Sequence, residues 1–269
     1  MPTVAVPQMA VADLDVETNL ATIAGRVTAL PDRVDVACFP EYALTGFVAD
    51  DRVRTVALSR DAPALERLAA LASTHDTAIL AGYVERAEPP STGTVDDEAA
   101  TDADSTLYNA AVYVHPSGER ETYRKRHLWA GEQEVLTPGT ERLVLDTPAG
   151  ATAVLTCYDL NAVAESAALA EARVDCLLVL GAWPAAHSEN WRLLLRARAL
   201  DGVRWVVGAG RTGRRTVPDA RPVEYAGRSA VVRPDGAVSA ALNRDERDLI
   251  ADLDPDVLAE QRAFIPVLD

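Results

Sequence analysis

Apolar residues along the chain follow two different periods, and the two periods alternate. Short apolar runs bounded by turn residues are typical of strands, whereas apolar residues three or four positions apart are typical of amphipathic helices. Predicted strands cover residues 3–9, 34–39, 77–84, 107–115, 120–126, 144–145, 151–156, 175–180, 203–209, 225–232, 237–242 and 248–253. Predicted helices cover residues 16–30, 62–75, 162–173 and 188–200, and a short helix begins at Pro255.

This order of elements predicts an α/β fold, because strands alternate with helices over much of the chain. Hairpin turns at 116–118 and 234–236 exclude a purely parallel sheet. We therefore expect two mixed sheets packed face to face with helices outside. No shift in composition divides the chain, so residues 1–269 are predicted to form one domain. Residues 88–105 are acidic, lack an apolar period and are predicted to form a solvated loop inside a hairpin connection.

The bulk composition is that of an ordinary globular protein. Of the 269 residues 48% are hydrophobic, and no apolar run reaches the roughly 18 to 20 residues that a transmembrane helix needs. The first residues lack a basic segment followed by an apolar one, so we expect no secretory signal. These features predict a cytoplasmic location.

The charge balance is strongly acidic, with 41 Asp and Glu against 26 Lys and Arg and a net charge of −15. Phosphate backbones and anionic membrane surfaces bind basic patches, so neither nucleic acid nor membrane is an expected partner. General solubility and adaptation to high salt both explain such acidity. The near absence of lysine favours the second explanation, a halophilic composition.

Lysine occurs once in the chain, at Lys125, beside 25 arginines. Lysine carries a compact and mobile point charge, whereas arginine is a planar fork that stays charged. A chance survivor in a lysine-poor composition is the plain interpretation. The sharper interpretation is a catalytic lysine, which requires partners elsewhere in the chain.

The three cysteines differ in their predicted surroundings. Their odd number and their spacing fit neither a disulfide framework nor a zinc site, so no metal is expected. Cys38 and Cys176 lie inside apolar strands and are predicted to be core residues. Cys157 ends an apolar strand ahead of a polar turn and a helix, where backbone N–H groups would stabilise a thiolate. A buried structural thiol is the alternative for Cys157.

Glu41 lies at the end of a predicted strand, after Pro40, and strand ends are where the active sites of α/β folds gather. A carboxylate in apolar surroundings can serve as a general base, although a solvated loop glutamate is the plainer interpretation. Glu41, Lys125 and Cys157 thus all lie at strand exits. His127 has no obvious carboxylate to orient it, which makes a Cys–His protease the weaker hypothesis. No G-x-S-x-G, P-loop or G-x-G-x-x-G motif supports the other common site types.

Three segments together resemble the motifs of a known family. Residues 38–42 (CFPEY), 123–128 (YRKRHL) and 155–160 (LTCYDL) look like the motifs of the carbon–nitrogen hydrolase (nitrilase) superfamily, in its order and at compatible spacing. Further matches follow at 137–139, 182–184, 196–199, 227–229 and 234–236. The resemblance covers essentially the whole chain and points to the amidase-like branch.

The resemblance implies a four-layer αββα sandwich that usually forms a homodimer or a larger homo-oligomer. It implies the catalytic residues Glu41, Lys125 and Cys157. A second family glutamate matches Glu132 best, with Glu134 as the nearby alternative.

The mechanism that the resemblance implies is acyl transfer to the cysteine without a metal or an organic cofactor. Cys157 attacks the carbon of an amide or nitrile, Glu41 moves the proton, and Lys125 with the backbone N–H of Tyr158 stabilises the oxyanion. A thioester forms and water hydrolyses it after ammonia has left. Trp183 is expected as a wall of the substrate pocket, with core packing as the alternative.

The sequence also departs from the family pattern. The cysteine motif of the family often continues with R-F-P-E, whereas this chain has 161–165 (NAVAE). A charge close to the pocket is thereby lost, so the dicarboxylate-monoamide substrate of omega-amidases is not carried over. We expect a hydrolase of a small linear amide or carbamoyl compound. The alternatives are a nitrilase proper, a drifted binding or regulatory member, and an ammonia-supplying glutamine amidase.

Overall fold

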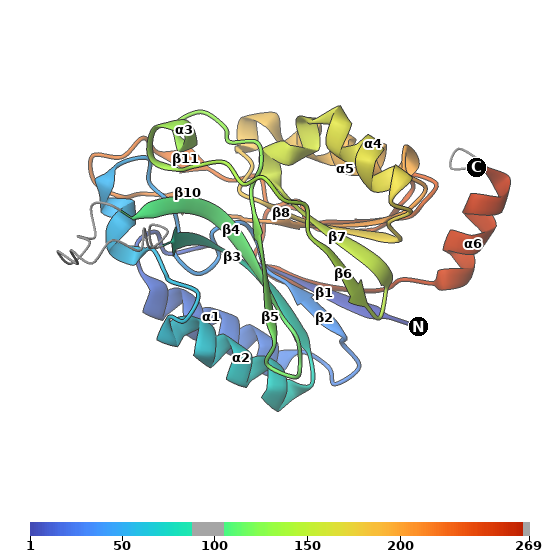
Figure 1. The fold of residues 1–269 in the computed structure, drawn as a ribbon, viewed down its shortest axis with the longest axis horizontal. Helices are drawn as coiled ribbons and strands as arrows, with labels where there is room; N and C mark the ends of the chain where they lie inside the picture. The colour runs from blue at the N-terminus through green and yellow to red at the C-terminus, as the bar shows by residue number, and fades with distance from the viewer. Residues whose placement is uncertain (88–104, 266–269) are drawn as a thin grey trace, which may run out of the picture.

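The computed structural model describes residues 1–87 and 105–265 (Figure 1). Its strands are β1 (Thr3–Gln8), β2 (Val36–Cys38), β3 (Ala78–Ala87), β4 (Thr106–Val114), β5 (Arg120–Arg124), β6 (Val144–Thr147), β7 (Gly150–Thr156), β8 (Cys176–Gly181), β9 (Trp205–Gly210), β10 (Arg214–Arg215), β11 (Val223–Glu224), β12 (Ala230–Val232), β13 (Val238–Ala241) and β14 (Arg247–Asp252). Its helices are α1 (Val16–Ala29), α2 (Pro63–His75), α3 (Glu132–Val135), α4 (Val163–Glu171), α5 (Ser188–Leu200) and α6 (Pro255–Phe264), with 3-10 turns η1 (Asp51–Val56), η3 (Cys157–Asn161) and η4 (Ala185–His187).

Two six-stranded sheets have the same internal plan. Their strand orders are β14-β1-β2-β3-β4-β5 and β13-β12-β9-β8-β7-β6. In each sheet three central strands are parallel, namely β1-β2-β3 and β7-β8-β9, and antiparallel strands flank them. Both sheets are therefore mixed, which confirms the predicted fold class.

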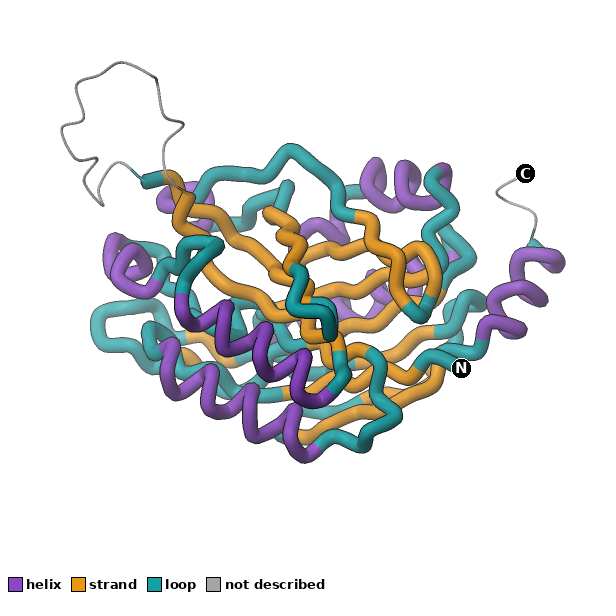
Figure 2. The backbone as a smooth tube through the Cα atoms, turned by 60° about the horizontal axis from the view of Figure 1, so that its bottom comes forward, coloured by secondary structure: helices purple, strands orange, loops and turns teal. Residues whose placement is uncertain are grey.

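Helices cover the outer faces of the two sheets. Figures 1 and 2 show α1 and α2 against the first sheet, and Figure 1 shows α4 and α5 on the opposite side of the molecule. Strand β2 contributes to two hydrophobic cores, one on each face of its sheet, because successive side chains of a strand point to opposite faces. Val36 packs into the core between the sheets, whereas Ala37 packs toward Ile23 and Leu65 of the two helices.

The elements that the sequence analysis missed or misplaced are short or irregular. The hairpin β10–β11 has two residues in each strand, which is too short for a periodic signal. Residues 225–229, predicted as strand, lie outside β12, and Tyr225 forms only an isolated bridge with Pro184. Val203 was expected to begin a strand but has φ 43°, so β9 begins at Trp205. The predicted acidic loop lies outside the described residues, except for Ser105.

No helix within the described ranges combines the length and the apolar character that crossing a bilayer requires.

A buried ion pair links the end of the second sheet to a loop of the first. The guanidinium of Arg211, after β9, donates to both carboxylate oxygens of Asp13 at 2.9 and 2.7 Å, and both side chains are almost fully buried. Arg211 also lies 4.0 Å above the ring of Tyr225. Asp13 accepts a further bond from the backbone N–H of Phe47 at 3.0 Å. The pair therefore fixes the loop that follows β2, which contributes to the site below.

Replacing Arg211 by Met is expected to lower the free energy of unfolding by about 3 to 5 kcal/mol, because Asp13 would stay buried without its cation. Urea denaturation measures this loss. Arg67→Met is the matched control, since Arg67 pairs with Glu17 on the surface, and it should cost no more than about 1 kcal/mol. Equal losses in the two variants would contradict this role of the buried pair.

Candidate active site

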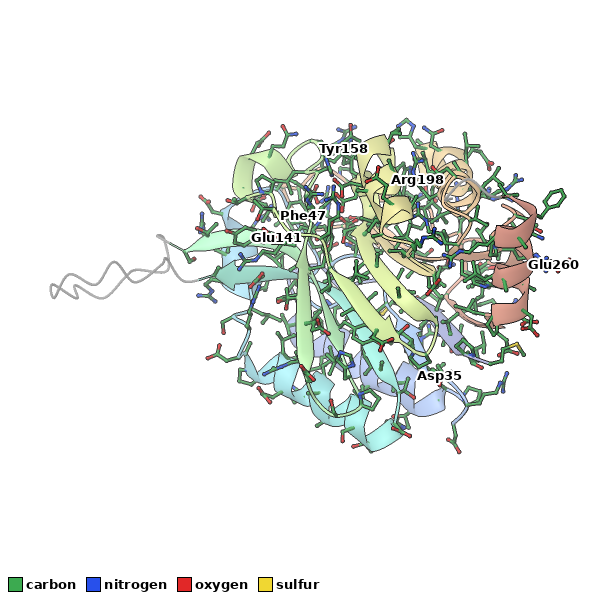
Figure 3. The ribbon with its side chains drawn as sticks, turned by 45° about the vertical axis from the view of Figure 1, so that its right-hand side comes forward. Asp35, Phe47, Glu141, Tyr158, Arg198 and Glu260 are labelled. Atoms are coloured by element: carbon green, nitrogen blue, oxygen red, sulfur yellow. The ribbon has the colours of Figure 1, made fainter. Side chains whose placement is uncertain are left out.

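The predicted site residues lie where several strands end. Glu41 follows β2, Lys125 follows β5, and Cys157 follows β7 directly. In Figure 3 the labelled Phe47 and Tyr158 lie toward one end of the sandwich, with Asp35, which precedes β2, at the opposite end. Because β2 and β7 are central parallel strands of the two sheets, their carboxyl ends deliver Glu41 and Cys157 to one region.

The ammonium group of Lys125 lies between two carboxylates. Its Nζ atom is 2.9 Å from Glu41 Oε1, 2.8 Å from Glu132 Oε2 and 3.0 Å from Glu132 Oε1. All three side chains are buried. Burial alone would lower the pKa of Lys125, but the carboxylates of Glu132 and Glu41 outweigh it and raise that pKa well above its ordinary value. The structure therefore keeps the only lysine of the chain charged.

Of the two glutamates proposed for the second carboxylate, the structure brings Glu132 to the lysine. Glu132 is the first residue of α3 and is buried, whereas Glu134 is exposed. The backbone N–H of Trp129 donates to Glu132 Oε2 at 2.7 Å. This bond holds the carboxylate toward the ammonium group, because one oxygen serves both donors.

Asn109 and Tyr42 complete the buried polar cluster, and the sequence analysis did not identify either. Asn109 Nδ2 lies 2.8 Å from Glu41 Oε1, from Glu132 Oε1 and from the hydroxyl oxygen of Tyr42. The hydroxyl of Tyr42 in turn donates to Glu132 Oε1. Asn109 was detectable in principle, because a buried asparagine in the apolar strand β4 requires a polar partner.

The backbone of the loop after β2 is strained at this point. Tyr42 has φ 59°, in the left-handed region that residues with a side chain rarely adopt. A Cβ atom at Gly82 of β3 would lie 2.4 Å from the backbone nitrogen of Tyr42 and 2.8 Å from the Cα atom of Glu41. Glycine is thus required at position 82 so that the loop can approach β3 and direct Glu41 inward.

Cys157 also has a left-handed backbone, with φ 49° at the first residue of η3. Its side chain is 7% exposed and lies beside the carboxylate of Glu41. Burial and the negative charge of Glu41 raise the pKa of the thiol well above its ordinary value, although Lys125 opposes them. Cys38 and Cys176 are fully buried core thiols, as predicted, and burial raises the pKa of Cys38 to about 12.

This result corrects the expectation of a thiolate stabilised by a following helix. The predicted polar turn is the 3-10 turn η3, and the predicted helix is α4, which begins only at Val163. The dipole of a helix acts mainly within its first turn, so its effect on the sulfur is small. Burial next to a carboxylate has the larger effect and keeps the proton on sulfur. The resting group is therefore a neutral thiol that contacts a potential base.

Asp159 holds the turn that contains Cys157 against the segment that contains Lys125. It is completely buried and accepts hydrogen bonds from the backbone N–H of Thr156 at 2.9 Å and the hydroxyl of Tyr123 at 2.8 Å. It also accepts from the backbone N–H of His127 at 2.9 Å. Two neighbouring segments are thereby fixed by one carboxylate.

The same residue corrects the expectation that His127 lacks an orienting carboxylate. Nδ1 of His127 lies 3.0 Å from Asp159 Oδ1, and this hydrogen bond raises the pKa of the imidazole. The two residues are 32 positions apart, so no local pattern reveals the contact. The imidazole interacts with Asp159, and Glu41 is the group that contacts the thiol of Cys157.

The two residues predicted to bind substrate differ in exposure. The side chain of Tyr158 is exposed beside the cysteine. Trp183 is buried and packs against Trp191 of α5, with ring centroids 5.7 Å apart. Its neighbour Ala182 donates a backbone hydrogen bond of 2.7 Å to Glu41 Oε2. Trp183 thus packs in the core and also adjoins the site; its contact with substrate stays a prediction.

The segment that departs from the family pattern forms an ion cluster of its own. Glu165 of α4 is buried and pairs with Arg126, and Arg142 donates to its other oxygen at 2.9 Å. Arg126 directly follows Lys125 in the chain. The cluster therefore ties the lysine segment to α4. Among the described residues, no group of three or more His, Cys, Asp or Glu side chains is arranged to hold a metal ion.

Comparisons with known proteins identify relatives of this chain by sequence. Over 255 residues the chain is 27% identical to an (R)-stereoselective amidase of a Pseudomonas species, which covers 95% of this chain and 86% of the relative. It is 28% identical over 245 residues to a 2-oxoglutaramate amidase of Paenarthrobacter nicotinovorans, with 88% and 78% covered. The chain thus resembles proteins named as amidases over most of its length.

The fold is that of solved structures from the same superfamily. The structure of XC1258 from Xanthomonas campestris, a CN-hydrolase superfamily protein, superposes with a TM-score of 0.84 at 23% identity, covering 99% of this chain and 96% of that one. A family model for carbon-nitrogen hydrolases matches residues 3–263, nearly the entire sequence. The chain therefore belongs to the carbon–nitrogen hydrolase family of the nitrilase superfamily.

Proposed function

We propose that this protein is an amidase that hydrolyses the C–N bond of a small linear amide or carbamoyl compound through a thioester on Cys157. The observation that carries the proposal is the buried ammonium of Lys125, held by Glu41 and Glu132 beside the thiol of Cys157. A nucleophile, a base in contact with it and a fixed positive charge are the groups that acyl transfer requires. The relatives named as amidases support an amide over a nitrile.

In the first half of the reaction Cys157 attacks the carbonyl carbon. Because its resting form is a neutral thiol, the proton has to leave as the S–C bond forms, and the contacting carboxylate of Glu41 accepts it. The thiolate then exists only while it reacts. Such an arrangement protects a buried cysteine from slow oxidation, which requires the thiolate form.

The carbonyl oxygen becomes negative in this step and needs donors. Lys125 supplies one, and its raised pKa keeps it a donor with full positive charge rather than a base. The backbone N–H of Tyr158, the residue after the nucleophile, supplies the second. In well-studied enzymes one such donor lowers the barrier by about 3 to 4 kcal/mol.

The second half of the reaction releases the acid. The C–N bond breaks, Glu41 returns its proton to the departing nitrogen, and ammonia leaves. Glu41 then takes a proton from water, whose oxygen attacks the thioester carbon and releases the carboxylic acid and the thiol. Glu132 does not touch the reacting atoms in this scheme; it positions Lys125.

The strained backbone at Cys157 supports this assignment. A residue with a side chain in the left-handed region costs about 1 to 3 kcal/mol and persists where the surroundings fix it. Here the capping carboxylate of Asp159 fixes the turn. A sharp turn at the end of a strand directs the sulfur out of the sheet toward Glu41. A homodimer and a cytoplasmic location stay predictions from the sequence.

Iodoacetamide is expected to label Cys157 far faster than Cys38 and Cys176, because only Cys157 has both exposed surface and a contacting base. Peptide mass spectrometry over time measures the three rates separately. Glu41→Gln should slow the labelling of Cys157 by about a hundredfold or more, the contribution of a general base. Equal labelling of the three cysteines would count against an activated nucleophile.

Ammonia release from a panel of small linear amides, carbamoyl compounds and nitriles tests the reaction itself. Cys157→Ala should abolish release, and Lys125→Arg should lower kcat by roughly 10² to 10³, because the planar fork cannot replace the point charge. Arg120→Lys on β5, the strand before Lys125, is the control and should retain activity, because Arg120 pairs with Glu66 on the surface. Full activity in Lys125→Arg would disprove the role of the lysine. If the wild-type protein releases no ammonia from any compound, the proposed function fails for this panel.

Asn109→Asp tests the donor shared by the two glutamates. The new carboxylate would repel both of them, the cluster would take up a proton, and the base for Cys157 would be lost. We expect labelling of Cys157 to slow by roughly tenfold or more, the equivalent of one hydrogen bond to a charged group.

The control for this variant is Asn19→Asp. Asn19 is equally buried but bonds only to the backbone of Ala12 and Leu44. The change should lower the melting temperature without slowing the labelling of the folded protein. If both variants label at the wild-type rate, Asn109 does not position the base.

A further inference from the structure

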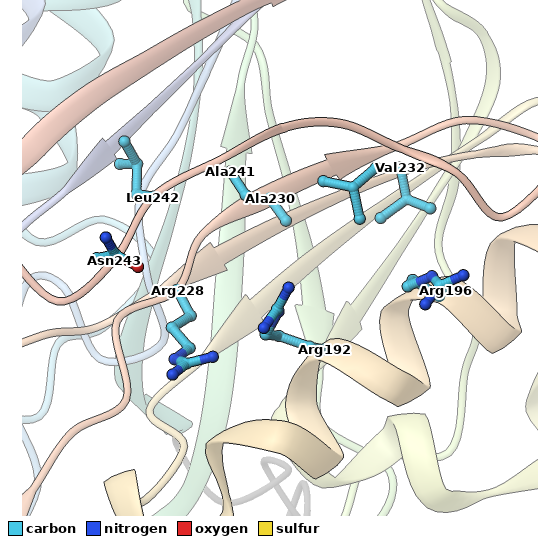
Figure 4. A pocket seen from close by; sticks show the side chains of 9 residues that line it. Arg192, Arg196, Arg228, Ala230, Val232, Ala241, Leu242 and Asn243 are labelled. Carbon is cyan, nitrogen blue, oxygen red and sulfur yellow. The ribbon is translucent and has the colours of Figure 1, made fainter.

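A cavity lies away from the candidate active site, between α5 and the hairpin β12–β13. Its volume is about 110 Å³, and its walls include three arginines, Arg192, Arg196 and Arg228. Figure 4 shows Arg192 and Arg228 extending into the space between helix and sheet, with Arg196 one turn further along α5. Apolar side chains of β12 and β13, together with Leu242 and the polar Asn243, line the remaining wall.

The charges around this cavity are poorly balanced. Glu189 is the carboxylate that serves two of the arginines, at 2.7 Å from Arg228 and 3.6 Å from Arg192, and it is 73% exposed. Ion pairs that are this exposed contribute little to stability. Arg196 donates to the backbone oxygen of Gly236 at 2.9 Å and, within the described ranges, contacts no carboxylate. Three guanidinium groups therefore face one carboxylate, in a protein whose net charge is −15.

The arginines are also placed at some cost to stability. Arg192 and Arg196 are four positions apart on one helix face, where like charges repel. Arg228 has φ 53°, in the left-handed region. Its backbone is fixed from both sides, since its N–H donates to Asn243 and its carbonyl oxygen accepts from Trp191 Nε1 at 3.0 Å. Its Nε atom is buried and has no hydrogen-bond partner among the described residues.

We propose that this cavity binds the phosphate group of a small molecule. Guanidinium forks match the oxygens of phosphate in geometry and charge. A phosphate group has about −1.5 to −2 charges at pH 7 and three acceptor oxygens, which balances the formal excess of two cations better than a single carboxylate would. The volume is several times what one water molecule needs. The apolar wall next to the arginines offers contact to the carbon part of a phosphate monoester.

The site is independent of the proposed amidase activity, because none of its arginines belongs to the cluster around Lys125. It is nevertheless close in structure to that cluster. Trp191, which bonds to the backbone of Arg228, packs against Trp183, the residue after Ala182. Ligand binding at Arg228 therefore has an optical reporter in Trp191.

Calorimetric titration of the full-length protein at constant ionic strength tests the site. Inorganic phosphate and phenyl phosphate are the two probes, with sodium chloride as the blank. We expect saturable binding to one site per chain. Tighter binding of phenyl phosphate would assign the site to a monoester, and equal binding would assign it to free phosphate. Tryptophan fluorescence should follow the same saturation curve.

Variants identify the residues. Arg192→Gln and Arg196→Gln should each weaken phosphate binding by roughly tenfold or more, since each removes a charged hydrogen bond. Arg67→Gln on α2 is the matched control and should bind as the wild type does. Circular dichroism verifies that all of the variants fold.

Three results would overturn the proposal. The first is the absence of saturable phosphate binding. The second is an equal loss of binding in Arg67→Gln, which would indicate a general effect of ions. The third is a change of sedimentation in Arg192→Gln or Arg196→Gln without phosphate binding to the wild type. The arginines would then bind carboxylates of a second copy of the chain.

Discussion

The burial of one positive charge between two negative charges is the constraint on which the rest of the site depends. Lys125, Glu41 and Glu132 are each costly to bury, and each is tolerated only while the other two remain in place. Their carboxylate oxygens need further donors, which Asn109 and the backbone N–H groups of two loops supply. Removing any one of these donors would leave a buried charge without a partner, so the cluster fixes the positions of every segment that contributes to it.

Those segments come from both sheets, and this explains features of the fold that a plain sandwich would not need. The loop after β2 passes close above Gly82, and the ion pair of Arg211 with Asp13 holds that loop from the second sheet. The turn after β7 is fixed by Asp159, which also holds the segment after β5. Rigid positions at three strand ends are what reacting groups require, because small displacements lower the rate of attack steeply.

Periodicity in the sequence predicted most of the elements. The three motifs pointed to Glu41, Lys125 and Cys157, which the structure brings together. Prediction from the sequence failed where the cause is a contact between distant residues. Asn109 shows only as a polar residue in an apolar strand, and its partners lie far away in the sequence. The pairing of His127 with Asp159 has no local signal, and the two-residue strands β10 and β11 have no period. The predicted stabilised thiolate at Cys157 failed for a similar reason. A turn ahead of a helix favours a thiolate, but burial next to Glu41 raises the pKa of the thiol, and this contact exists only in the folded chain.

The composition acquires a physical meaning from these contacts. Arginine suits Asp13, where one planar fork meets two oxygens of one carboxylate. Lys125 has a different role, because its ammonium contacts two carboxylates on different segments, the loop after β2 and helix α3. In the proposed reaction it also contacts an oxyanion in a third direction. A tetrahedral ammonium can donate in three directions, whereas a guanidinium donates only in its plane. A chain that uses arginine for every other cation therefore still requires lysine at this one position.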